Sequence, residues 1–225
     1  MSSTAHHKPI AKSRWLQAQK ATAMKWHGKD VLAERLEHAK TNYLPHLQQI
    51  VEKLPPKPTV LDIGSGPVCL SHFLASANRI FIDPLLDDYQ RAYPGALPSG
   101  RYLNCMAETI PLAAASCDLV LCFNALSYTM NPELVIHEIE RVLKPDGFLV
   151  VTIITVPPLR ARLHYLAERY IPALRDESQP YHYSHHGIRN TISRHFDISE
   201  EHLLQRHTGL GNPWSEWMFV CTHHR

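Results

Sequence analysis

An acidic residue and two glycines stand at the end of a short apolar segment, which reads Val60-Leu61-Asp62-Ile63-Gly64-Ser65-Gly66-Pro67. Gly64 and Gly66 have no side chain, so they tolerate positive φ angles and let the backbone approach a ligand closely. A helix predicted directly after this loop would direct its unpaired N–H groups toward the same point. The loop therefore predicts a site for a polar or anionic ligand.

A second acidic residue, Asp83, ends the next apolar segment of the chain. A carboxylate at this place can accept hydrogen bonds from both ribose hydroxyls of a nucleoside. A dinucleotide site would also have a glycine three positions after Gly66, where this chain has Cys69. Asp62 would repel a phosphate, but it suits a ligand with an ammonium or sulfonium group. These residues favour S-adenosylmethionine over a dinucleotide.

Strand-like and helical segments alternate from residue 58 onward, and they must position these side chains. Apolar β segments are expected at 59–63, 79–82, 101–105, 118–123 and 148–154, and helices at 68–77, between 82 and 101, and at 132–143. Two further β segments, 198–205 and 216–222, flank a turn and predict an antiparallel hairpin. The pattern predicts an α/β fold, a Rossmann-like, doubly wound, mostly parallel sheet of seven strands.

Helical segments flank this core on both sides. Residues 14–53 have apolar residues at helical spacing, with a kink expected at Pro45, and residues 159–174 predict a further helix that could cap a site. The expected organisation is an N-terminal helical arm or lid (1–57), an S-adenosylmethionine-binding core (58–156), cap helices with a His-rich loop (157–196), and the C-terminal hairpin that completes the sheet (197–225).

Composition excludes several classes of protein. The chain has 225 residues, of which 44% are hydrophobic and 20% charged, so most of it should fold around one core. Its five cysteines include no C-x-x-C pair, which predicts reduced thiols, no zinc site and a cytoplasmic location. The net charge of +2 is too small for a nucleic-acid footprint. No apolar run is long enough to span a membrane, but a basic excess in residues 1–57 leaves peripheral contact with an anionic membrane surface open.

The order of these motifs resembles the class I S-adenosylmethionine-dependent methyltransferases, in particular the small-molecule branch (methyltransferase type 11) that includes quinone-biosynthesis enzymes. The loop at residues 60–67 is similar to the first motif of that family. Three further segments resemble its later motifs: Ile80-Phe81-Ile82-Asp83-Pro84, Ala107-Glu108-Thr109-Ile110-Pro111, and Arg141-Val142-Leu143-Lys144-Pro145-Asp146-Gly147.

The resemblance implies a role for each matching residue. Gly64, Ser65 and Gly66 would form the turn around the amino-acid part of the cofactor, and Asp62 would orient its ammonium group. The remaining cofactor-binding residues are those expected at the ribose (Asp83, Pro84), at the adenine (Met106, Ala107, Glu108) and under the methionyl portion (Asn124). Two positions depart from the family pattern: Val68 replaces a frequent glycine, and Met106 replaces a frequent acid.

Three residues are candidates for the acceptor side of the reaction. Tyr128 falls where many relatives have a histidine, and His182 and His185 belong to a His-rich stretch where relatives place residues that face the substrate. Histidine suits a general base because its ordinary pKa lies near neutrality. No metal is expected. The segment Asn124-Ala125-Leu126-Ser127 lacks the D/N-P-P-Y/F motif of amino methylation on adenine or glutamine, which disfavours nucleic-acid N-methylation.

These observations predict a methyltransferase that acts on the oxygen or carbon of a small molecule by in-line displacement and releases S-adenosylhomocysteine. Val68 and Met106 motivate an alternative, in which the chain is a non-catalytic module that serves as a scaffold for a partner protein. A third alternative, another enzyme class on the same fold such as aminopropyl transfer, lacks an acidic motif on the substrate side. The oligomeric state is not predicted.

Overall fold

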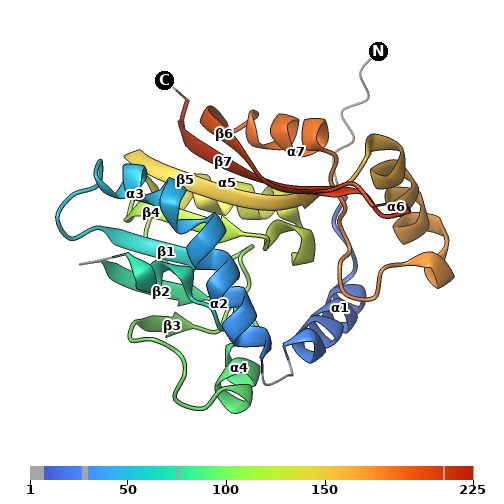
Figure 1. Cartoon of the computed structure of the whole chain (residues 1–225), viewed down its shortest axis with the longest axis horizontal. Helices are drawn as coiled ribbons and strands as arrows, with labels where there is room; N and C mark the ends of the chain where they lie inside the picture. Colours follow the sequence, from blue (N-terminus) through green and yellow to red (C-terminus); the bar gives the residue numbers. More distant parts are fainter. Residues whose placement is uncertain (1–7, 27–29, 75–76, 210, 225) are drawn as a thin grey trace.

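A seven-stranded sheet in the order β3-β2-β1-β4-β5-β7-β6 forms the centre of the computed structural model (Figure 1), which describes residues 8–26, 30–74, 77–209 and 211–224. Strands β1 to β5 pair in parallel, whereas β7 is antiparallel to both β5 and β6. The strands are β1 (Thr59–Ile63), β2 (Asn78–Ile82), β3 (Arg101–Leu103), β4 (Cys117–Phe123), β5 (Leu143–Thr155), β6 (Phe196–His207) and β7 (Trp214–His223). The predicted mixed sheet and its C-terminal hairpin are confirmed.

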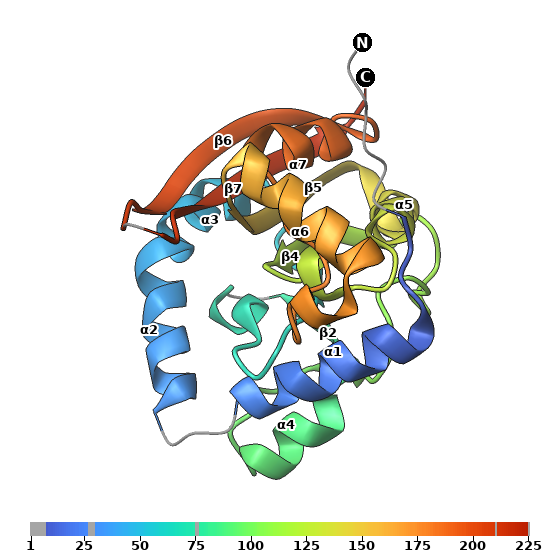
Figure 2. The same cartoon turned by 90° about the vertical axis from the view of Figure 1, so that its right-hand side faces the viewer.

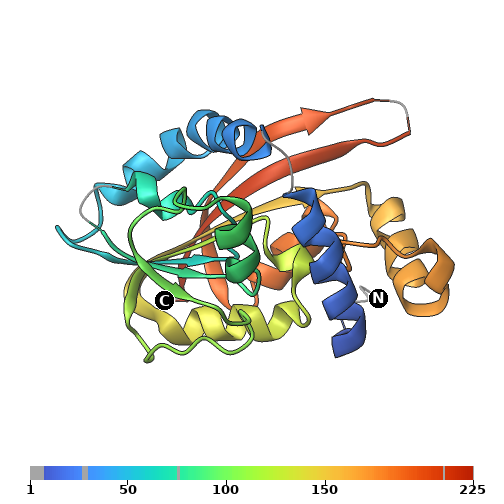
Figure 3. The same ribbon diagram turned by 90° about the horizontal axis from the view of Figure 1, so that it is seen from below.

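Alternate residues of the central strands face two separate cores. On β1, Leu61 packs with helices α5 (Pro132–Val142) and α7 (His185–Ile192), whereas Val60 packs with α2 (Val31–Asn42) and α3 (Leu44–Val51). Figure 3 shows α5 on one side of the sheet and α2 and α3 on the other. A strand that is covered on both faces must be apolar along its whole length, which is why these strands are continuous apolar runs in the sequence.

The N-terminal region contains three helices where the sequence predicted one kinked helical segment. The first is α1 (Lys12–Lys25), and α2 and α3 meet at Tyr43. Pro45 lies in the first turn of α3, where the backbone needs no N–H donor, so it begins a helix instead of bending one. Figure 2 looks onto the side of the molecule where α1, α2 and α6 (Pro158–Tyr170) lie.

The helix predicted over residues 68–77 is wrong. The described part of this segment contains a single 3-10 turn, η1 (Leu70–Phe73), which follows Cys69 in a left-handed conformation with φ of 48°. The Ser71 N–H donates to Asp62 Oδ2 at 3.0 Å instead of joining a helical ladder. The loop therefore ends in a tight turn, and the described part of residues 68–77 holds no α-helix whose dipole would be directed at the glycines.

The remaining short elements connect these layers. They are α4 (Leu86–Ala92), η2 (Leu126–Tyr128) and η3 (Pro172–Leu174). Arg14 of α1 donates to both carboxylate oxygens of Glu168 on α6, at 2.8 and 2.9 Å, so these two helices are joined by a bidentate ion pair. None of the helices in the described ranges has the length and apolar character that crossing a membrane requires.

Candidate functional site

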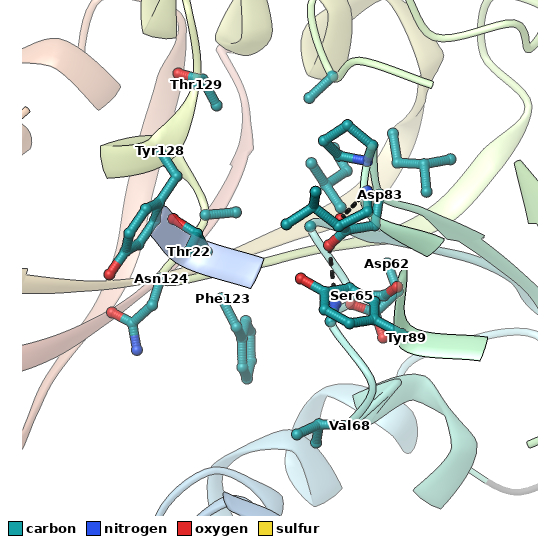
Figure 4. Close-up of a pocket in the computed structure, with 18 of the residues that line it drawn as sticks. Thr22, Asp62, Ser65, Val68, Asp83, Tyr89, Phe123, Asn124, Tyr128 and Thr129 are labelled. Carbon is teal, nitrogen blue, oxygen red and sulfur yellow. Dashed lines mark hydrogen bonds between the residues drawn. The ribbon is translucent and has the colours of Figure 1, made fainter. Parts of the chain in front are cut away.

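A cavity of about 280 Å³ lies at the carboxyl ends of β1, β2 and β4, and residues of α1 and α2 also line it. Every residue of the predicted cofactor set lines this cavity: Asp62, Gly64, Ser65, Gly66, Asp83, Pro84, Met106, Ala107, Glu108 and Asn124. Figure 4 shows Asp62, Ser65 and Asp83 on one side, and Asn124 and Tyr128 on the other. Carboxyl ends of parallel strands are where ligands bind in open α/β sheets, since the connecting loops diverge there.

The glycine loop is held against the neighbouring strand. The N–H groups of Gly64 and Ser65 donate to the Ile82 carbonyl at 2.8 and 3.3 Å, and both glycines have positive φ, 60° for Gly64 and 52° for Gly66. A Cβ at Gly64 would lie 2.5 Å from the Ala125 Cβ, so only glycine fits there. The buried Ser65 Oγ has no hydrogen-bond partner in the described structure.

Asp83 fixes the other side of this loop. Its Oδ2 accepts a hydrogen bond from the Gly66 N–H at 3.0 Å, and its Oδ1 accepts one from the Leu85 N–H at 2.8 Å (Figure 4). A carboxylate has about four lone-pair positions, so two remain for ligand hydroxyls. Burial raises the pKa of Asp83 to about 6, although both backbone hydrogen bonds oppose that rise.

Asp62 is also buried at the cavity wall. Burial raises the pKa of this carboxyl to about 7, and the nearby charge of Asp83 adds to the rise, whereas the hydrogen bonds from Ser71 oppose it. A cation in the cavity would reverse the effect of burial, because an opposite charge favours the ionised carboxylate. The electrostatics of this wall therefore suit a positively charged ligand.

The residues present fit S-adenosylmethionine. Asp62 and Asp83 provide acceptors for ammonium and ribose hydroxyl groups, and the glycine loop leaves a cradle that a Cβ at Gly64 would disturb. Two buried polar atoms at the cavity, Ser65 Oγ and Asn124 Oδ1, have no partner in the described structure. A buried polar atom without a hydrogen-bond partner lowers the stability of the folded protein. A polar ligand that forms hydrogen bonds with these two atoms would remove that penalty.

Glu108 also has a structural role, at the start of α5, that the sequence did not predict. Its Oε1 accepts hydrogen bonds from the backbone N–H groups of Met130 at 2.6 Å and Asn131 at 2.9 Å. Asn131 caps α5, with its side chain accepting from the Leu134 N–H. Glu108 thus lines the cavity and also holds the loop that starts α5.

A buried acid on β7, Glu216, is the centre of a polar group that the sequence analysis did not identify. Its Oε1 accepts from the Tyr43 hydroxyl at 2.5 Å and from Asn124 Nδ2 at 2.6 Å, and its Oε2 lies 3.2 Å from His38 Nε2. His38, Tyr43 and Asn124 all line the cavity. We call these four residues the Glu216 group.

The sequence did contain a signal for Glu216. Strand residues with a period of two share a face, so Glu216 lies on the same face as Met218 and Val220, which are both buried. A lone acid on the core side of a strand must have polar partners. Burial and the charge of Glu216 raise the pKa of Tyr43 well above its ordinary range, so Tyr43 remains a donor to this carboxylate.

The structure does not bring His182 and His185 to the cavity. The ring of His182 stacks on His164 with centroids 3.8 Å apart, and its Nε2 is 3.6 Å from Asp176 Oδ2. Burial, followed by the neighbouring His164, lowers the pKa of His182 to about 4. His185 contacts Glu201 and Trp217 on the terminal hairpin. Both histidines belong to the packing around α6 and α7 in this structure.

Tyr128, the third acceptor-side candidate, lines the cavity and also connects the end of β4 to α1. Its carbonyl accepts from Trp15 Nε1 at 3.1 Å and from Gln19 Nε2 at 2.8 Å. Its hydroxyl is 3.5 Å from Gln179 Oε1. In the part of the chain that the structure describes, no three metal-binding side chains converge on one point.

Known proteins resemble part of this chain in sequence. A family model described as a methyltransferase domain, Methyltransf_11, matches residues 61–151. The chain is 32% identical over 115 residues to the ubiquinone/menaquinone biosynthesis C-methyltransferase of Syntrophotalea carbinolica, a match that covers 48% of each protein. It is 30% identical over 134 residues to the malonyl-[acyl-carrier protein] O-methyltransferase of a Marinomonas species, covering 53% of this chain and 50% of the relative.

The fold also matches a solved structure. A S-adenosylmethionine-dependent methyltransferase of Methanosarcina mazei superimposes with a TM-score of 0.58 at 20% identity, covering 78% of this chain and 96% of the other. This likeness supports the fold. The matches to the two curated relatives span about half of the length of each relative.

Proposed function

We propose that this chain, which carries a class I S-adenosylmethionine-dependent methyltransferase domain, methylates an oxygen or a carbon atom of a small molecule. The observation that carries the proposal is the meeting of Asp62, the glycine loop and Asp83 at one cavity. The two curated relatives described above, a C-methyltransferase and an O-methyltransferase, support these two acceptor types.

S-adenosylmethionine held by Asp62, the glycine loop and Asp83 would supply a methyl group on a sulfonium, and its in-line transfer to the acceptor would leave S-adenosylhomocysteine. The leaving group is already good, so the protein mainly aligns the two reactants and excludes water. The aromatic side chains of Trp15, Trp26 and Tyr43 line the cavity and suit a flat or apolar acceptor.

A hydroxyl or an activated carbon must also lose a proton. We assign its acceptance to the Glu216 group, because Tyr43 lines the cavity and donates directly to the Glu216 carboxylate. The acceptor's proton passes to the Tyr43 oxygen while the Tyr43 proton passes to Glu216. General-base assistance of this kind contributes a factor of about 10² to 10⁴ in rate.

The test is methyl transfer from isotopically labelled S-adenosylmethionine to a panel of quinols, phenols and carboxylic acids. The expected result is a labelled product together with an equal amount of S-adenosylhomocysteine. At limiting cofactor, Asp83→Ala should lower product by about tenfold or more, since an acceptor for the ribose hydroxyls is lost, whereas the control Asp87→Ala, at an exposed position on α4, should not. Cofactor binding without product from any metabolite pool would favour the scaffold alternative.

A further inference from the structure

The outward face of α6 and η3 is apolar. Six of the eleven large apolar side chains that are exposed in the described structure lie between residues 159 and 174: Leu159, Leu163, Leu166, Tyr170, Ile171 and Leu174. Leu159 is 70% exposed and Leu163 57% exposed. At 3.6 residues per turn, Leu159, Leu163, Leu166 and Tyr170 follow one another along a single side of α6. We call this set of six residues the α6 stripe.

The opposite side of α6 packs on the protein, so the stripe is not a misplaced core face. Glu168 binds Arg14 of α1, and His164 stacks on His182. Figures 1 and 3 place α6 at one end of the longest axis of the molecule. The α6 stripe therefore points outward from one tip of the protein.

Arginines flank the α6 stripe on both sides. By helical geometry, Arg162 and Arg169 lie along one flank and Arg160 along the other. Residues 158–177 contain four arginines and three acids; the carboxylate of Glu168 is paired with Arg14 and Arg175, and Asp176 and Glu177 follow beyond η3. An apolar ridge bordered by basic side chains has the pattern of a helix that lies in the interface of a membrane.

We propose that the α6 stripe docks on the surface of an anionic lipid bilayer, with the leucines inserted below the headgroups and the arginines against lipid phosphates. The helix has thirteen residues, which is too short to span a bilayer. A second copy of the chain is disfavoured as the occupant, because a symmetric contact through this face would bring the two arginine sets together. A lipid surface would bury the leucines of the α6 stripe and place anionic phosphates beside its arginines.

This docking does not depend on the proposed methyl transfer, and its test uses no activity measurement. The full chain is centrifuged with vesicles of phosphatidylcholine that contain about 30% phosphatidylglycerol, and with vesicles of phosphatidylcholine alone. The expected result is sedimentation with the anionic vesicles only, and release at high salt, because screening weakens the attraction of the arginines.

Three double variants separate the contributions of the leucines and of the arginines to vesicle binding. Leu159→Ser with Leu163→Ser should lower the bound fraction by about tenfold or more, since two buried leucines are lost. Arg162→Gln with Arg169→Gln should remove the preference for anionic lipid. The matched control is Leu134→Ser with Leu203→Ser, two leucines that are 40% and 42% exposed on α5 and β6; it should bind like the unaltered chain. Unchanged thermal unfolding midpoints establish that each variant is folded.

Three results would overturn the proposal. The first is failure of the unaltered chain to sediment with anionic vesicles. The second is an equal loss of binding in the Leu134 and Leu203 control. The third is a dimer, seen by light scattering, that the Leu159 and Leu163 variant dissociates, which would assign the α6 stripe to a second copy of the chain.

Discussion

Asp62 and Asp83 are both buried beside the glycine loop, yet their hydrogen bonds differ. Asp83 accepts from both Gly66 and Leu85, whereas Asp62 accepts from Ser71 on the far side of the loop. The pKa of Asp62 is the more strongly raised, to about 7, because burial dominates and the charge of Asp83 adds to it. Asp62 is therefore the group whose ionisation a cationic ligand changes most near neutral pH.

The first prediction is that cofactor binding strengthens as the pH rises. Below a pKa of about 7, a cation must drive a proton from Asp62, so affinity increases by up to about tenfold per pH unit and levels off above that pKa. Calorimetry between pH 6 and 8, in buffers of different ionisation enthalpy, should detect proton release. Asp62→Asn should flatten the profile. Proton uptake on binding would contradict this assignment.

The second prediction concerns stability in the absence of ligand. The pKa values of Asp62 and Asp83 are raised in the folded protein, to about 7 and about 6, above the ordinary value of 3.8. Between these limits the unfolded chain binds fewer protons than the folded one, so stability falls as the pH rises from about 4 to 7. Thermal unfolding should show this trend from these two groups, and Asp62→Asn should reduce its slope. A slope that the variant does not change would refute it.

The third prediction concerns Glu216. Glu216→Gln keeps the size of the side chain and an acceptor for Tyr43, but it cannot take a proton. Product formation should fall by about 10² or more, because the side chain can no longer accept the proton, and the cofactor affinity should be unchanged. A variant with full activity, or one whose only change is weaker cofactor binding, would remove Glu216 from the proton path.

At the scale of elements, the glycine loop determines where the carboxylates lie. The fourth prediction is that Gly64→Ala destabilises the protein more than Gly95→Ala. Both glycines have positive φ, which costs alanine about 1 to 2 kcal/mol. At Gly95 the added Cβ meets nothing within 4 Å, whereas at Gly64 it would lie 2.5 Å from Ala125. Urea unfolding of the two variants should show the difference; equal costs would mean that the loop can shift.

The elements that the sequence predicted well are those whose pattern is local. The apolar strands, helix α5 and the terminal hairpin follow from alternation, helical spacing and turn residues. The helix over residues 68–77 failed because Asp62, from a neighbouring strand, takes the Ser71 N–H. A contact between residues of different elements is not visible in local periodicity.

The candidate site likewise contains residues that the sequence predicted and residues that it did not. The motif residues line the cavity, because the parallel sheet brings the ends of β1, β2 and β4 together. The Glu216 group joins α2, the junction of α2 and α3, the residue that follows β4, and β7, which only the tertiary fold brings together. His182 and His185 were chosen for their residue type and position in the chain, but His182 packs on α6 and His185 contacts the hairpin, away from the cavity.

At the scale of the whole molecule, two parts of the chain line the cavity: the central sheet and the N-terminal helices. The sheet residues belong to the segment that matches the methyltransferase family model, residues 61–151. Helices α1 and α2 also line the cavity, and α1 is joined to α6 by Arg14 and Glu168. All three helices lie outside the matched segment, so we expect the choice of acceptor to depend on elements that the family pattern does not specify.

The central claim is that this cavity binds S-adenosylmethionine through Asp83 beside the glycine loop. The most direct test is calorimetry of the unaltered chain, Asp83→Ala and the exposed control Asp87→Ala with S-adenosylmethionine and S-adenosylhomocysteine. The account predicts that the unaltered chain and Asp87→Ala bind both ligands, and that Asp83→Ala binds about tenfold or more weakly, since an acceptor for the ribose hydroxyls is lost. Absence of binding to the unaltered chain, or equal affinity in Asp83→Ala, would contradict it.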